Sequence, residues 1–150
     1  MKIVCLILLT CFSCAIQAIN VTFINPSVPG TAFWDRVTAV AYAAAADLDI
    51  ELSVVYGRDN RIFNHQTIQR IASREIKPDF VIFMPYGGNA KNSYAALDKA
   101  EIPFVTMERT LHQDEQESVG SPQEKYANWL GEVYHDNVHA GRLLADTLIG

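Results

Sequence analysis

The chain has 150 residues, which is enough for one domain of ordinary size with a buried core. Hydrophobic residues make up 49% of the chain and charged residues 19%, which excludes the composition of an intrinsically disordered protein. The formal net charge of −5 excludes an overall basic field that would attract a phosphate backbone, so we expect no nucleic-acid partner.

Residues 1–18 have the pattern of a secretory signal peptide. Lys2 precedes an apolar run, and small and polar residues follow as far as Ala18, after which we expect cleavage. A buried or membrane-anchored first helix is the alternative, but the apolar run is shorter than the roughly 20 residues that span a bilayer. All three cysteines lie in this segment, so we expect a secreted domain without a disulfide or a cysteine metal site.

After Ala18, short β-branched or aromatic runs alternate with longer segments of helical period, which is typical of βαβ units. The apolar run Phe80 to Met84 predicts a central strand buried on both faces. The fold class that we predict is α/β, an open parallel sheet of about five strands with helices on both faces. In chain order we expect strand 19–24, helix 33–48, strand 50–56, helix 60–75, strand 80–84, a helix from a cap at Asn92 to Ala100, strand 103–107, strand 129–133 and helix 138–149.

Apolar residues recur at spacings of three and four along three of these helices, so each should present one apolar face. The polar stretch 108–125 lacks such a pattern, and we expect a long loop there, which is usually functional or mobile. The residues of the apolar faces are Val37, Val40, Ala41, Ala44 and Leu48, then Ile68, Ile71 and Ala72, and finally Val138, Gly141, Ala145 and Leu148.

Polar and aromatic side chains gather where the predicted strands end. Ligands of open parallel sheets bind outside the carboxyl ends of the strands, which selects the loops 25–34, 85–89, 108 onward and 134–137. These loops supply aromatic rings and paired hydrogen-bond donors and acceptors, which a sugar requires. The candidate ligand-binding residues are Asn25, Phe33, Trp34, Tyr86, Asn89, Glu108, Arg109, Asp136 and Asn137.

Several of these residues have a structural alternative. Glu108 and Arg109 could form an exposed ion pair of little consequence. Because their side chains diverge on a helix, we expect one of Phe33 and Trp34 to point into the core and the other into the cleft. Asp136 is more readily explained as a helix cap than as a ligand group.

Four segments resemble one known family. The run IPFVTMERT, followed after a longer loop by LGEVYHDNVHAGRLLADTLI, resembles a strand end and a helix start of the ribose-binding-like type I family of periplasmic sugar-binding proteins. Phe33-Trp34 is similar to the paired aromatics after strand one of that family, and KPDFVIFMP is similar to its third strand. The resemblance extends over nearly all of 19–150. It implies the N-terminal lobe of a two-lobed periplasmic protein, whose second lobe would follow residue 150.

The resemblance implies a receptor that binds a sugar or a sugar-like small molecule and catalyses no reaction. The family usually has Asp where Glu108 stands, which leaves the ligand open. The stretch 111–125 is longer than in simple ribose-binding proteins and resembles the subgroup that includes the autoinducer-2 receptor. The implied membrane partner is an ABC permease for uptake or, alternatively, a sensor kinase or chemoreceptor for signalling.

Two other classes of protein have this architecture. An α/β enzyme acting on a small polar substrate would need an acid/base pair in the cleft, and no nucleophile motif supports it. The effector domain of a sugar-responsive repressor would need a DNA-reading helix pair where this chain has its signal peptide. We expect no cofactor, since the loop after strand one lacks the dinucleotide fingerprint. We expect no metal, since His135 and His139 have no evident third ligand beyond Asp136.

Overall fold

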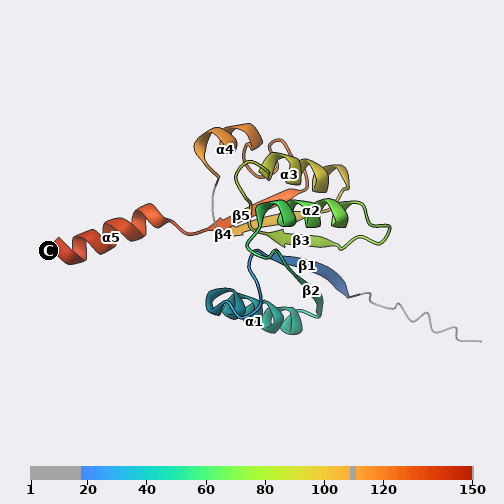
Figure 1. The fold of residues 1–150 in the computed structure, drawn as a ribbon, viewed down its shortest axis with the longest axis horizontal. Helices are drawn as coiled ribbons and strands as arrows, with labels where there is room; N and C mark the ends of the chain where they lie inside the picture. The colour runs from blue at the N-terminus through green and yellow to red at the C-terminus, as the bar shows by residue number, and fades with distance from the viewer. Residues whose placement is uncertain (1–17, 109–110, 150) are drawn as a thin grey trace, which may run out of the picture.

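The computed structural model describes residues 18–108 and 111–149, so the predicted signal peptide lies outside it apart from its last residue. Strands and helices alternate along the described chain (Figure 1). In chain order they are β1 (Ile19–Asn25), α1 (Ala32–Asp47), β2 (Ile50–Tyr56), α2 (Arg61–Ala72), β3 (Phe80–Phe83), α3 (Ala90–Lys99), β4 (Phe104–Glu108), α4 (Gln113–Val119), β5 (Trp129–Tyr134) and α5 (Asn137–Ile149).

The five strands form one parallel sheet in the order β2-β1-β3-β4-β5. Figure 1 shows α1 on one face of this sheet and α2 and α3 on the other. The predicted fold class is therefore confirmed. The chain adds β2 on one side of β1 and then returns past β1 to add β3 on the other side. This reversal creates a switch point between β1 and β3, where the loops after the two strands separate and leave room for a ligand.

The main core lies between the sheet and the layer that contains α2 and α3. Trp129, Tyr94 and Phe104 are almost fully buried there, with the Trp129 ring 4.7 Å from Tyr94 and stacked on Phe104 at 6.5 Å. The Trp129 indole N–H donates hydrogen bonds to Thr106 Oγ1 at 3.2 Å and to the Gly131 carbonyl at 3.0 Å. Burial raises the pKa of Tyr94 far above its usual range, so this phenol stays neutral.

The face of the sheet that carries α1 is less well covered. An apolar cavity of about 340 Å³ lies between α1 and the sheet, lined among others by Ala41, Ala44, Phe23 and Met107. The predicted apolar face of α1 does point toward the sheet, but only Thr38 and Ala45 of this helix are buried.

The polar stretch after β4 differs from the sequence prediction of a long loop, because it contains α4. This helix is short, and Val119 is its single buried residue, so it shows no apolar periodicity. The start of α3 also differs: the helix begins at Ala90, whereas Asn92 was the predicted cap.

The last helix, α5, buries none of its residues. It begins shortly after β5 and extends away from the rest of the described chain (Figure 1). Val138 and Leu148 are 67% and 77% exposed, so the predicted apolar face has no partner within the described residues. No helix in residues 18–108 or 111–149 is long and apolar enough to cross a membrane.

Candidate functional site

A small cavity lies at the carboxyl edge of the sheet. Its volume is about 250 Å³, and its lining comes from the ends of four strands or the loops that follow them. The segments after β1 and β3 contribute most of it, which places the cavity at the switch point of the sheet. The lining residues are Pro26, Phe33, Trp34, Asp59, Met84, Tyr86 and Glu108.

Two aromatic rings from the first turn of α1 form one wall of this cavity. Phe33 and Trp34 pack edge to face with their ring centres 5.1 Å apart. Trp34 also lies 6.5 Å from Phe23, so its ring is half-buried and held against β1. Phe33 is 52% exposed. Both rings therefore line the cavity. This differs from the expectation that one ring would point into the core and the other into the cleft.

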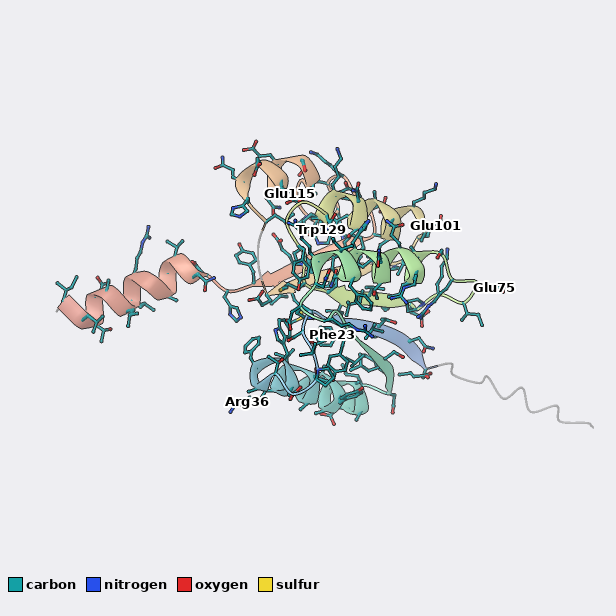
Figure 2. The ribbon with its side chains drawn as sticks, in the orientation of Figure 1. Phe23, Arg36, Glu75, Glu101, Glu115 and Trp129 are labelled. Atoms are coloured by element: carbon teal, nitrogen blue, oxygen red, sulfur yellow. The ribbon has the colours of Figure 1, made fainter. Side chains whose placement is uncertain are left out.

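The loop after β3 is held in place by a carboxylate from α4. Glu115 accepts hydrogen bonds from the Gly88 N–H at 2.9 and 3.1 Å and from the Ala90 N–H at 3.2 Å. Asn89 at the N-cap of α3 makes no side-chain capping bond, so Glu115 supplies the cap from another helix. Figure 2 labels Glu115 in α4. The contact ties α4 to the loop that carries Tyr86 in the cavity lining.

Replacing Glu115 with alanine should loosen this loop. The Gly88 and Ala90 amides would lose a charged acceptor, which is worth about 1.5–3 kcal/mol, so their hydrogen exchange should accelerate by roughly tenfold or more. Glu117→Ala is the matched control, because that exposed carboxylate only accepts a hydrogen bond from Gln113 of the same helix. Equal exchange rates in the two variants, measured by NMR, would contradict this role of Glu115.

The structure brings four of the nine predicted ligand-binding residues together. Phe33, Trp34, Tyr86 and Glu108 all line the cavity. The Tyr86 hydroxyl lies 3.5 Å from the Pro26 carbonyl across the switch point. Arg109 lies outside the described residues.

Four other predicted residues lie away from the cavity. Asn25 is fully buried: its amide N–H donates to Thr38 Oγ1 at 3.0 Å and its side-chain oxygen accepts from the Ser27 N–H at 2.9 Å. Asn89 precedes α3 and does not line the cavity. Asp136 accepts a hydrogen bond from the His139 N–H at 2.9 Å, which is the capping role weighed against ligand binding, and Asn137 is the exposed first residue of α5.

Three lining residues were not predicted from the sequence. Met84 follows β3 directly and is almost fully buried, and Pro26 belongs to a loop that was selected for other residues. Asp59 lies in the loop after β2, which was not selected although it also follows a strand end. Among the described residues, no group of three or more His, Cys, Asp or Glu side chains is placed to hold a metal ion.

Comparisons with known proteins bear on the fold. No protein-family model and no curated protein matches the sequence. One solved structure with a similar fold is a periplasmic sugar-binding protein from Pseudomonas fluorescens, with 22% sequence identity and a TM-score of 0.60. The match covers 65% of this chain and 30% of that chain, so the matched part corresponds to less than a third of the protein that this chain resembles. The described part of the chain thus has the α/β fold of a periplasmic binding-protein lobe.

Proposed function

We propose that this chain is the N-terminal lobe of a periplasmic receptor that binds a sugar or sugar-like small molecule and does not transform it. The observation that carries the proposal is the cavity at the switch point, which is lined by two aromatic residues and by Glu108. Sugars present apolar C–H faces that stack on aromatic rings and hydroxyls that donate to carboxylates. At about 250 Å³ the cavity is smaller than pockets for drug-sized ligands, as suits a small solute.

A second lobe belongs to the proposal. It is supported by α5, which leaves the sheet after β5 and buries nothing within the described residues. A helix with exposed leucines such as Leu144 and Leu148 needs an apolar partner. The similar solved protein is more than twice as long as this chain, which leaves room for such a partner. In our proposal the ligand binds between two lobes that close around it by a hinge motion.

The closed receptor would deliver its ligand to an ABC permease in the membrane. The signal peptide is proposed from the pattern of residues 1–18, and the permease and the periplasmic location from the resemblance of the sequence to periplasmic sugar-binding proteins. They are tested by fractionating cells that express the full gene with an epitope tag. A cytoplasmic, uncleaved product would contradict the location.

Trp34→Ala tests the aromatic wall directly. The variant should bind a monosaccharide about tenfold more weakly, because ring contacts contribute about 0.5–1.5 kcal/mol beyond the buried area. Thermal shift identifies the sugar, since a ligand that binds the folded state raises the melting temperature. Calorimetry then compares the variants. Tyr42→Ala is the control, because Tyr42 is a half-exposed ring of α1 that does not line the cavity. The same affinity in both variants would contradict the proposed site.

A further inference from the structure

Asp59 brings a second carboxylate to the cavity. It was not among the candidate residues predicted from the sequence. It lies in the four-residue loop between β2 and α2 and lines the cavity together with Trp34 and Glu108. Its side chain makes no hydrogen bond or ion pair with any other residue in the described ranges 18–108 and 111–149. The carboxylate oxygens are therefore available to a ligand.

The backbone around Asp59 is held against the loop after β1. The Gly57 N–H donates to the Asn25 carbonyl at 2.6 Å, the Arg58 N–H to the Ser27 carbonyl at 3.0 Å and the Asp59 N–H to the Pro26 carbonyl at 2.8 Å. These three bonds join the loops after β1 and β2.

The approach of the two loops requires glycine at one position. A Cβ atom on Gly57 would lie only 3.1 Å from the carbonyl oxygens of Asn25 and Pro26. The buried side chain of Asn25 fixes the opposing loop through its bonds to Thr38 and Ser27. Asn25 thus serves the site indirectly, by fixing the backbone on which the Asp59 loop rests.

Asp59 reaches the cavity through an uncommon backbone conformation. Arg58 and Asp59 have φ values of 60° and 52°, in the left-handed region that side chains other than glycine, asparagine and aspartate rarely adopt. Two such residues in succession turn the chain sharply between β2 and α2. In this conformation, residue 59 lines the cavity together with residues from the other three strand ends.

The charges of the lining indicate which sugars fit. Its described part contains two carboxylates, Asp59 and Glu108, and no Lys, Arg or His. Carboxylates accept hydrogen bonds from hydroxyl and ammonium groups and repel a carboxylate or phosphate on a ligand. A neutral or amino sugar can donate a hydrogen bond to Asp59, whereas a sugar acid would bring a further negative charge close to the two carboxylates.

We propose that Asp59 is a specificity-determining residue of this cavity, which accepts hydrogen bonds from a neutral or amino sugar and disfavours anionic sugars. The inference rests on the proposed sugar-binding function and adds the class of sugar to it. It concerns a residue that is not part of the four segments quoted for the resemblance to known sugar-binding proteins.

The test is Asp59→Asn, with Asp49→Asn as the matched control. Asparagine tolerates the left-handed conformation and removes only the charge. Asp49 is also an exposed aspartate with a φ of 53°, but it lies in the turn between α1 and β2, at the opposite edge of the sheet. Any general effect of losing one surface charge would appear in both variants.

The probes are D-galactose, D-galactosamine and D-galacturonate, which differ mainly in charge, and D-ribose with D-ribose 5-phosphate. We measure affinities by calorimetry on the mature protein expressed from the full gene, so that both proposed lobes are present. The wild type should bind the neutral or amino sugar at least tenfold more tightly than its anionic counterpart. Asp59→Asn should weaken that binding about tenfold, as expected for loss of a charged hydrogen bond. It should also reduce the ratio between the affinities for the neutral or amino sugar and for its anionic counterpart.

Each outcome has one meaning. Suppose that a sugar binds, and that Asp59→Asn and Asp49→Asn have the same affinity and the same preference for neutral or amino sugars over anionic ones. The proposed role of Asp59 would then be wrong, while the proposed function would stand. A wild type that prefers the anionic sugars would overturn the inference in the same way. If none of the five probes binds the wild type, the proposed function itself fails.

Discussion

Replacing Trp129 with alanine should lower the free energy of unfolding by about 3–5 kcal/mol, the usual cost of truncating a buried tryptophan. The side chain is fully buried and contacts Tyr94 and Phe104, and Figure 2 labels it between the sheet and the helices above it. A domain of this size is usually stable by only about 5–15 kcal/mol. The variant should therefore lose a substantial part of its free energy of unfolding.

Trp129→Phe separates the hydrogen bonds from the packing. Phenylalanine keeps much of the ring but leaves Thr106 Oγ1 and the Gly131 carbonyl without the indole N–H. We expect a loss of about 1–3 kcal/mol, the cost of leaving a buried polar group unpaired. Urea denaturation followed by circular dichroism measures both variants. Losses below about 1 kcal/mol for Trp129→Ala would show that this ring does not hold the main core together.

A pair of leucine variants should give very different results. Leu97→Ala in α3 should cost about 2–5 kcal/mol, because Leu97 is fully buried in the main core. Leu144→Ala in α5 should change stability by less than about 0.5 kcal/mol, because its side chain is 62% exposed on a helix that buries nothing. The same residue type is truncated in both, so the difference reports only on burial.

The same urea experiment decides the position of α5. A loss for Leu144→Ala close to that of Leu97→Ala would mean that α5 packs on the rest of the chain, contrary to the structure. It would also remove one of the two supports for a second lobe.

The strands were predictable because their apolar runs are short, nearly continuous and bounded by turns. The strand at Ile50–Tyr56 has the predicted bounds, three others differ by one residue at one end, and β4 is shifted by one residue at both ends. The helix α4 was missed because a helix with one buried residue has no apolar period. The period of α5 correctly indicated a helix with an apolar side, but periodicity cannot show what covers that side.

The strand-end rule indicated the edge of the sheet at which the cavity lies, and four of the nine candidate residues line that cavity. That these residues bind a ligand stays a prediction. Asn25 was a reasonable candidate by residue type, but its side-chain amide is buried and hydrogen-bonded to Thr38 and Ser27. Asp59 was missed because the loop after β2 was not selected, although it follows a strand end like the other loops of the cavity. Glu115 acts across helices, so no local pattern indicated it.

The most direct test of the account is an NMR titration of isotope-labelled protein, from residue 19 onward, with monosaccharides. The account predicts saturable shifts of the Trp34 indole and of the backbone amides of Tyr86, Asp59 and Glu108, with little change along α5 or beside the apolar cavity of α1. Shifts that gather elsewhere, or no shift with any sugar, would contradict the proposal that the switch-point cavity is a sugar site.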